Sequence, residues 1–303
     1  MKNNFVIDEK DANSRLDRWF KRVIFDVPQS LIEKNIRKGN IKVNSIKEKG
    51  SYKLKLFDKI QINNMNFKKK IVKKEKFVYT PSKKDLSFSS SLFIENNENF
   101  AVINKPAGIS VQSGTKSKKN IIDILKNTSE FENARPFSVH RIDKETTGIL
   151  IVAKNRQYAQ LFTSLFRIRK IHKVYLGVVV GEFKGQKGKL VDDLIYYEDD
   201  KKTKLKAITN FSVIDTNNNY SLLELSPETG RKHQLRRQLL LKGNPILGDS
   251  KYRISKNLKK KSDYLMLHAY KINFSIDNIK YKFRAELPEI FKSTLKEKFL
   301  KIF

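Results

Sequence analysis

The sequence predicts an α+β fold with a mixed, mostly antiparallel central sheet, preceded by a small α/β module. Two observations support this fold class. In residues 91–303, short apolar strand patterns are interspersed with helical patterns, without the regular strand–helix alternation of a parallel βαβ architecture. In residues 14–62, two helical patterns precede short strand patterns. The length of 303 residues fits one large domain or two smaller ones.

Residues 14–62 begin with two predicted helices. Arg15–Phe20 opens an amphipathic helix, and a break at Pro28 separates it from the next one. Ser30 and Glu33 have the S-x-x-E spacing of a capping box, which predicts that the second helix begins there.

The rest of the module and the segment after it differ in composition. Gly39 occupies the position expected just beyond the second helix, and alternating apolar residues predict short strands at 41–44 and 54–62. Residues 63–90 contain runs of lysine and a serine-rich stretch but few apolar side chains. This composition predicts a basic linker between the module and the domain at 91–303.

The large domain contains a nearly continuous apolar run at Ile149–Ala153, which predicts a strand buried on both faces. Other apolar patterns predict strands at Phe100–Ile103, His172–Val180 and Tyr220–Leu225. Helical spacing predicts helices at Asn155–Lys170 and His233–Leu241.

Composition limits the classes of function. The 63 Lys and Arg exceed the 32 Asp and Glu, which gives a net charge of +31 and predicts a polyanionic partner such as nucleic acid. Part of this excess is typical of an AT-rich genome, because Lys, Asn and Ile are abundant together. The absence of Cys excludes disulfides, thiol nucleophiles and thiolate-bound zinc. With no signal-peptide pattern and no apolar run near ~18 residues, a cytoplasmic protein without a membrane anchor is expected.

Three polar clusters contain residue types suited to catalysis or RNA contact. The first is His140–Gly148, where a loop before the buried strand either presents Asp143 to a cleft or forms a charged surface turn. The second is Thr229–Arg237, where cations at the start of a predicted helix fit phosphate binding or an exposed basic face. The third is Lys173–Tyr175, whose tyrosine either packs in the core or stacks on a base.

No sequence pattern indicates a cofactor or a metal. The glycine-rich fingerprints of nucleotide-binding folds and the G-x-S-x-G elbow are absent, and four His leave little room for a multi-histidine site. The residues by themselves therefore predict a basic, cytoplasmic, RNA- or DNA-binding α+β protein with a small N-terminal module.

The three clusters, taken in order, resemble a known family. His140–Lys154 (HRIDKETTGILIVAK) resembles the H-R-L-D-x-x-T-S-G-L-L-L-x-A-K signature of RluA-type pseudouridine synthases. Lys173–Tyr175 resembles their K-x-Y motif, and Thr229–Arg236 (TGRKHQLR) resembles their T-G-R-T-H-Q-I-R motif. Shorter matches occur in the same order, at Asn104–Gly108, Gly248–Tyr252 and Leu267–Ala269. Residues 14–62 resemble an S4 RNA-binding domain.

The resemblance implies isomerisation of uridine to pseudouridine, and within the family it is greatest to the large-ribosomal-subunit synthase C group. It implies Asp143, Tyr175 and Arg236 as catalytic residues. By this resemblance, Asp143 would act as nucleophile at C1′ or on the base, or would assist a glycal route, and Arg236 matches the position that forms an ion pair with it. Tyr175 matches the position that stacks on the target base and would serve as a base in the final proton removal. Because the reaction conserves atoms, it implies no nucleotide, redox cofactor or metal.

The resemblance also implies RNA-binding residues and a partner. The residues expected to bind RNA are His140, Arg141, Ile142, Arg231, His233 and Leu235 in the catalytic domain and Arg15, Ser30, Arg37 and Lys38 in the S4-like module. The implied partner is large-subunit ribosomal RNA, bound by a monomer. Lys232 departs from the family pattern, which has Thr there, and adds a positive charge near the site.

Two alternatives stay open at this stage. The first is an RNA-binding or ribosome-assembly protein that keeps the fold without catalysis, although the three implied catalytic residues are all present. The second is a phosphodiester nuclease. It would need a metal-binding carboxylate group or paired histidines, which the motifs do not provide.

Overall fold

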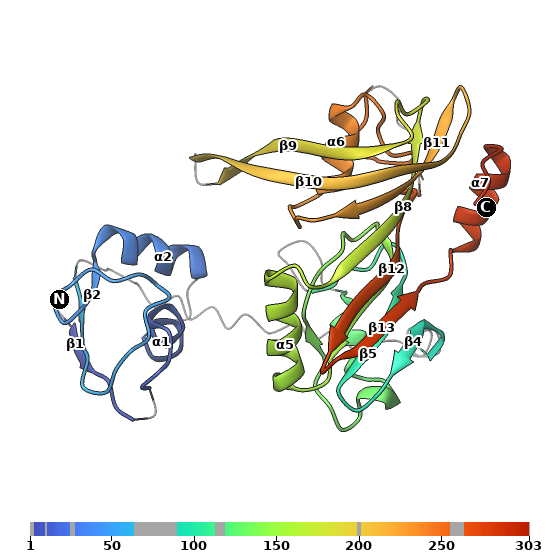
Figure 1. Cartoon of the computed structure of the whole chain (residues 1–303). Helices are drawn as coiled ribbons and strands as arrows, with labels where there is room; N and C mark the ends of the chain where they lie inside the picture. Colours follow the sequence, from blue (N-terminus) through green and yellow to red (C-terminus); the bar gives the residue numbers. More distant parts are fainter. Residues whose placement is uncertain are drawn as a thin grey trace. The chain divides into compact units, whose positions relative to one another are not determined.

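The computed structural model describes residues 3–9, 11–24, 28–63, 90–112, 119–198, 201–254 and 264–302 (Figure 1). Contacts within the chain divide it into two units, Met1–Glu75 and Lys76–Phe303. Most of the linker predicted at 63–90 lies outside the described residues.

The first unit combines two helices with a three-stranded antiparallel sheet. Its elements are β1 (Asn3–Val6), α1 (Leu16–Val23), α2 (Gln29–Lys38), β2 (Ile41–Val43) and β3 (Lys59–Ile62), and the strand order is β1-β3-β2. The helices and strands share one apolar core that includes Trp19, Phe20, Ile36 and Ile60. Because β1 pairs with β3, the unit starts earlier than residue 14; a four-residue edge strand has too little periodicity to be recognised in the sequence.

The predicted capping box is wrong. Helix α2 begins one residue before Ser30, with Pro28 at the N-cap and no side-chain capping bond. The carbonyl of Pro28 accepts the first helical N–H groups, from Leu31 and Ile32, at 3.0 and 3.3 Å. Ser30 is therefore an exposed residue of the first turn. The predicted end of the helix is confirmed, because Gly39 adopts the left-handed conformation with φ of 76°.

The second unit contains a ten-stranded mixed sheet. Its central path is β4-β5-β7-β12-β8-β11-β10-β9, with β6 paired to β7 and β13 paired to β12. The strands are β4 (Phe93–Asn96), β5 (Phe100–Lys105), β6 (Phe137–Ser138), β7 (Thr147–Ala153), β8 (His172–Val180), β9 (Lys187–Glu198), β10 (Lys201–Thr216), β11 (Tyr220–Pro227), β12 (Leu267–Ile276) and β13 (Ile279–Arg284). In the described pairings only β7 and β12 run parallel, so the predicted mixed, mostly antiparallel sheet is confirmed.

Helices cover both faces of this sheet. They are α4 (Ile121–Leu125), α5 (Arg156–Arg167), α6 (Gln234–Leu241) and α7 (Glu289–Glu297), with short 3-10 turns at Ser90–Leu92 and Ser129–Phe131. Helix α5 ends three residues earlier than predicted, because Arg169 takes a positive φ of 60° and the N–H of Lys170 turns back to the carbonyl of Leu165. None of the helices in the described part of the chain has the length and apolar character needed to cross a bilayer.

Strand β7 lies inside the sheet, between β5 and β12, and every residue of it is buried, as predicted. Leu150 and Val152 pack in one apolar cluster, whereas Ile149 and Ile151 pack in another on the opposite face. At its start, Gly148 has a φ of 103°, and a Cβ there would lie 2.2 Å from the carbonyl oxygen of Ala269 in β12. Glycine is therefore required where the polar loop enters the sheet.

Candidate active site

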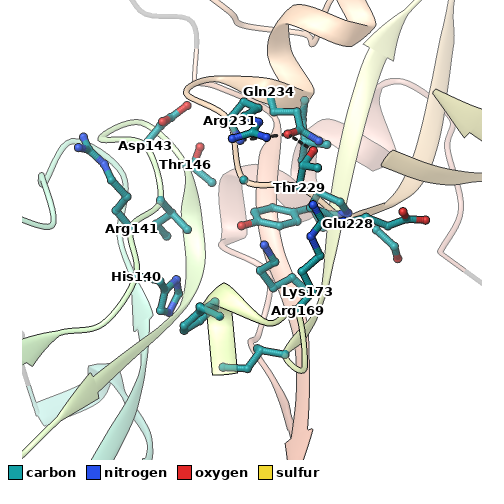
Figure 2. Close-up of a pocket in the computed structure, with 18 of the residues that line it drawn as sticks. His140, Arg141, Asp143, Thr146, Arg169, Lys173, Glu228, Thr229, Arg231 and Gln234 are labelled. Carbon is teal, nitrogen blue, oxygen red and sulfur yellow. Dashed lines mark hydrogen bonds between the residues drawn. The ribbon is translucent and has the colours of Figure 1, made fainter. Parts of the chain in front are cut away.

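A pocket of about 930 Å³ lies in the second unit, between the loop before β7, the α5–β8 connection and the β11–α6 connection (Figure 2). The three polar clusters singled out in the sequence all line it, and they contribute Asp143, Tyr175 and Arg236. The fold thus brings together three segments that are separated by about 30 to 60 residues in the chain.

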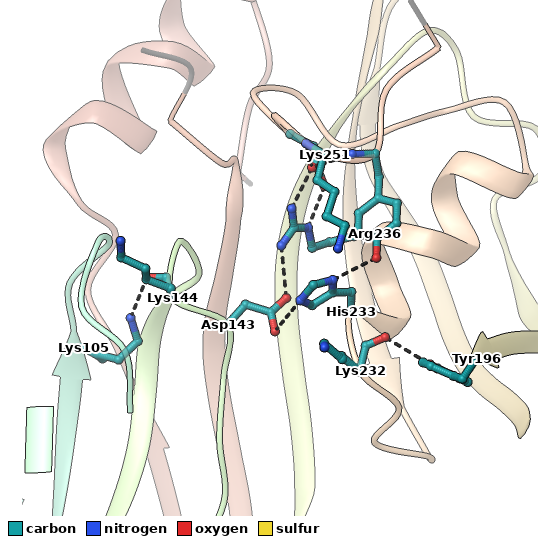
Figure 3. Close-up of polar contacts among 10 residues, drawn as sticks. Lys105, Asp143, Lys144, Tyr196, Lys232, His233, Arg236 and Lys251 are labelled. Carbon is teal, nitrogen blue, oxygen red and sulfur yellow. Dashed lines mark hydrogen bonds and ion pairs between the residues drawn. The ribbon is translucent and has the colours of Figure 1, made fainter. Parts of the chain in front are cut away.

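The carboxylate of Asp143 faces two basic side chains from the start of α6 (Figure 3). Nη1 of Arg236 donates to its Oδ2 at 3.3 Å, and Nε2 of His233 lies 3.7 Å from its Oδ1. The Asp143 side chain is 22% exposed. It therefore borders the pocket while Arg236 and His233 hold its carboxylate. The ion pair implied by the family resemblance is therefore present in the structure.

Arg236 is held in place by a second carboxylate, Asp249. Its Nε and Nη2 donate to the two oxygens of Asp249 at 2.6 and 2.7 Å. Burial opposes both charges, but the mutual ion pair outweighs it, so the pKa of Arg236 is raised and that of Asp249 is lowered. The backbone N–H groups of Lys251 and Tyr252 also donate to Asp249, both at 2.8 Å. Arg236 thus presents a fixed cation to Asp143.

His233 occupies the N-cap of α6 in the left-handed conformation, with φ of 54°. Its Nδ1 is hydrogen-bonded to the hydroxyl of Tyr252 at 2.9 Å, which turns Nε2 toward Asp143. Burial lowers the pKa of His233, as do neighbouring cations that include Arg236, although Asp143 acts in the opposite direction. The imidazole is therefore biased toward its neutral form.

Tyr175 projects from β8 into the same pocket. The strand pairs with β11 on one side and β12 on the other, so the backbone of Tyr175 is fixed opposite Leu225 and Ala269. Its ring packs against the apolar clusters on both sides of the pocket. Burial, together with the nearby charge of Asp143, raises the pKa of Tyr175, so its hydroxyl stays protonated at neutral pH.

A buried lysine anchors the loop that contains Asp143. Lys105 is fully buried, and its Nζ donates to the carbonyls of Pro106, Ile109 and Lys144 at 2.6, 3.0 and 3.2 Å. Burial lowers its pKa to about 7. The three acceptors match the three donors of an ammonium group. Lys105 belongs to one of the shorter family matches, yet its role in holding the loop was not predicted.

His140 supports the same loop from the other side. Its Nε2 accepts the N–H of Ile151 at 2.9 Å, and its ring lies 4.5 Å from that of Phe166. Burial lowers its pKa to about 3, so the imidazole is neutral. His140 was expected to bind RNA. It does line the pocket, but its Nε2 is already engaged in holding the loop to β7.

The other expected RNA-binding residues of this domain also line the pocket. Arg141 is exposed at the rim, whereas Ile142 and Leu235 are buried walls from opposite sides. Arg231 donates its Nε to the carbonyl of Lys206 at 3.1 Å. The lining contains further cations from Arg167, Arg169, Lys173 and Lys232, against the carboxylates of Asp143 and Glu228. The pocket therefore favours a negatively charged ligand.

Four further residues that were expected to bind RNA belong to the first unit, which is described by itself. Ser30, Arg37 and Lys38 are exposed on α2. Arg15 donates two hydrogen bonds, of 2.6 and 3.0 Å, to the buried Asp17. Among the described residues, no group of three or more His, Asp or Glu side chains is arranged to hold a metal ion.

Comparison with known proteins agrees with this geometry. The model of the RNA pseudouridylate synthase family matches residues 99–241, which include Asp143, Tyr175 and Arg236. The structure of human RNA pseudouridylate synthase domain containing 4 superimposes with a TM-score of 0.61 and 26% sequence identity, over 72% of this chain and 98% of that one. The fold and the pocket therefore define an RNA pseudouridine synthase.

Two relatives are similar over nearly their full lengths. Ribosomal large subunit pseudouridine synthase C of Rickettsia conorii is 36% identical over 297 residues, which is 93% of this chain and 97% of the relative. The protein of the same name from Rickettsia felis is 35% identical over 298 residues, or 92% and 95% of the two chains. The chain belongs to the RluA family of pseudouridine synthases.

Proposed function

We propose that this enzyme converts specific uridines of large-subunit ribosomal RNA to pseudouridine, as a monomer in the cytoplasm, with Asp143 as the catalytic residue. The names of the relatives support the choice of RNA, since both are ribosomal large subunit synthases. The observation that supports the catalytic role most directly is the position of Asp143, which borders the pocket and is paired with Arg236 at 3.3 Å.

The reaction requires one bond to break and another to form within the same nucleotide. The N1–C1′ bond of uridine breaks, the uracil turns while it stays bound, and C5 bonds to C1′. The proton on C5 is then lost and N1 gains one, so the atoms balance. Asp143 either forms a covalent bond with C1′ or with the base, or removes a sugar proton in a glycal route. Each route needs the carboxylate beside the reacting nucleotide, and Arg236 holds the side chain of Asp143 at the edge of the pocket through their contact of 3.3 Å.

Tyr175 is proposed to hold the uracil while it turns. A ring that stacks on a base contributes about 1–3 kcal/mol, comparable with the few kcal/mol that extrusion of a nucleotide costs. The pKa of Tyr175 is raised, so it would act as a base toward C5 only if its own proton passed on to a neighbour such as Asp143. Stacking is therefore the role that its environment favours first.

The remaining polar residues are proposed to hold the RNA around the flipped uridine. Arg141 at the rim is suited to fill the space that the nucleotide leaves, and Arg231 is suited to a phosphate contact. His233 orients Asp143, while Ile142 and Leu235 exclude water from the base. In the first unit, Arg15, Ser30, Arg37 and Lys38 are proposed to contact RNA as part of an S4 domain.

The experiment that tests this proposal is a map of pseudouridines in cellular ribosomal RNA with and without the gene. We expect one or more sites of the large-subunit RNA to lose pseudouridine in the deletion strain and to regain it when the wild-type gene is restored. An unchanged map would instead favour a protein of the same fold that binds RNA without catalysis.

A further inference from the structure

Strands β9 and β10 form a long hairpin that extends beyond the rest of the sheet (Figure 1). Strand β10 pairs with β11 only from Thr209 to Thr216, whereas its first half, Lys201–Ile208, pairs with β9 alone. The register is continuous along the whole hairpin, so residues directly opposite each other share one face.

The inner face of the hairpin is packed against α6. Leu190, Leu194 and Ala207 are buried there. The hydroxyl of Tyr196 donates to the carbonyl of Lys232 at 3.0 Å, and Arg237 donates to the carbonyl of Ile195 at 2.8 Å. The hairpin is therefore a fixed arm, held by the helix that also supplies Arg236.

The outer face of the hairpin is basic and exposed. Lys202 lies opposite Tyr197, Lys204 opposite Ile195, and Lys206 opposite Asp193. The three lysines are exposed, and within the described residues none of them forms an ion pair. Tyr197, at 76% exposed, adds a large aromatic ring with no core contact. An exposed aromatic ring among lysines is typical of surfaces that bind nucleic acid.

This outer face leads directly to the catalytic pocket. Asn210, on the same face of β10, lines the pocket and donates to Glu228 at 3.0 Å. Lys189, which lies opposite Asn210, pairs with Glu228 at 2.8 Å. The eight residue-to-residue steps from Lys202 to Asn210 span about 26 Å of strand. RNA whose uridine enters the pocket can therefore continue along the hairpin.

We infer that the outer face of the β9–β10 hairpin is a docking surface for the RNA strand that flanks the target uridine, with Lys202, Lys204 and Lys206 at phosphates and Tyr197 stacked on an unpaired base. This inference rests on the proposed function, because it concerns how the same RNA is held. The complementary charge and the continuity with the pocket support RNA as the occupant.

The test compares two full-length variants with equal loss of charge. Lys202→Gln with Lys204→Gln removes two lysines from the hairpin, and Lys280→Gln with Lys282→Gln removes two exposed lysines from β13, outside the pocket. Binding to a transcribed fragment of large-subunit ribosomal RNA is measured over a range of KCl concentrations. For the hairpin variant we expect about tenfold weaker binding and a logarithmic salt slope that is smaller by about 2.

The β13 variant is expected to bind like the wild type, and both variants to melt at the wild-type temperature. Equal salt slopes for the two variants would contradict the proposal that the outer face of the hairpin binds RNA. Tyr197→Ala supplies a second measurement, with weaker binding expected only for fragments that keep unpaired nucleotides beside the site. Pseudouridine formation by the wild type is assayed on the same fragments. Absence of product would contradict the proposed function. The binding comparison would still decide whether the outer face of the hairpin binds RNA.

Discussion

Arg236 donates to both carboxylate oxygens of Asp249 and turns its remaining nitrogen toward Asp143. The side chains of Arg236 and Asp249 are almost inaccessible, at 7% and 0% exposed. We therefore propose that Asp249 is a positioning residue, which acts on the site through the guanidinium of Arg236 and does not need to contact RNA itself.

Asp249→Asn is expected to remove the charge that holds Arg236 while it preserves most of the volume. Loss of one partner of a buried ion pair costs about 3–5 kcal/mol, so the free energy of unfolding in urea is expected to fall by that order. At temperatures where the variant stays folded, pseudouridine formation is expected to fall about 100-fold through misplacement of Arg236, with RNA affinity retained. Glu289→Gln, in the exposed pair with Lys292, is the control and is expected to leave both measurements unchanged.

Tyr175→Phe and Tyr175→Ala separate the ring from the hydroxyl. The Phe variant keeps the ring that stacks on the base, so its RNA affinity is expected to stay at the wild-type level. Any loss of product formation by this variant then measures the contribution of the hydroxyl group. The Ala variant is expected to lose about 1–3 kcal/mol of binding free energy as well. Because burial raises the pKa of Tyr175, the activity of the wild type is expected to show no titration of a phenol between pH 6 and 9. If the Ala variant bound RNA with wild-type affinity, stacking of Tyr175 on the base would be excluded.

The buried His268 of β12 predicts a loss of stability in acid. Burial lowers its pKa to about 4, whereas an unfolded histidine titrates near ~6.5. Below pH ~6.5 the unfolded state therefore binds more protons, and stability falls as the pH decreases toward 4, by about 3 kcal/mol from this residue. Urea unfolding of the wild type and of His268→Gln over this range measures the contribution. The exposed His172→Gln is the control, and an equal pH dependence of all three proteins would contradict the assignment to His268.

The exposed basic side chains at the end of α2 are expected to contribute to RNA affinity and not to the chemical step. Arg37→Gln combined with Lys38→Gln is expected to raise KM several-fold and to leave kcat near the wild-type value, because these side chains belong to the first unit. Steady-state kinetics on ribosomal RNA fragments measure both constants. An unaltered KM would show that this surface does not bind the substrate.

The sequence predicted the elements whose signal is local. The apolar run of β7 and the helical spacing of α5 need no partner to be recognised, and both elements are present, although α5 ends three residues before its predicted end. The capping box at Ser30 was wrong because Pro28, two residues earlier, is already the N-cap of the helix. Periodicity did not reveal the β9–β10 hairpin, since the apolar residues Val191, Ile195 and Ile208 share its outer face with lysines and blur the alternation.

The site was predicted in part, for a similar reason. Family motifs identified Asp143, Tyr175 and Arg236, and the fold brings them to one pocket. The pairing of Asp249 with Arg236 depends on a turn that brings a residue 13 positions away back to α6. Lys105 lies 39 positions before Lys144, whose carbonyl it binds. Such contacts depend on tertiary structure, so motif spacing alone does not predict them.

The central claim is that Asp143 performs the chemistry, and Asp143→Asn tests it most directly because this variant removes one charge and almost no volume. The purified variant and the wild type are incubated with the same ribosomal RNA fragment, and pseudouridine is quantified together with RNA affinity. The account predicts no product from the variant, with an RNA affinity within a few fold of that of the wild type. Pseudouridine formation at a rate near that of the wild type would contradict it.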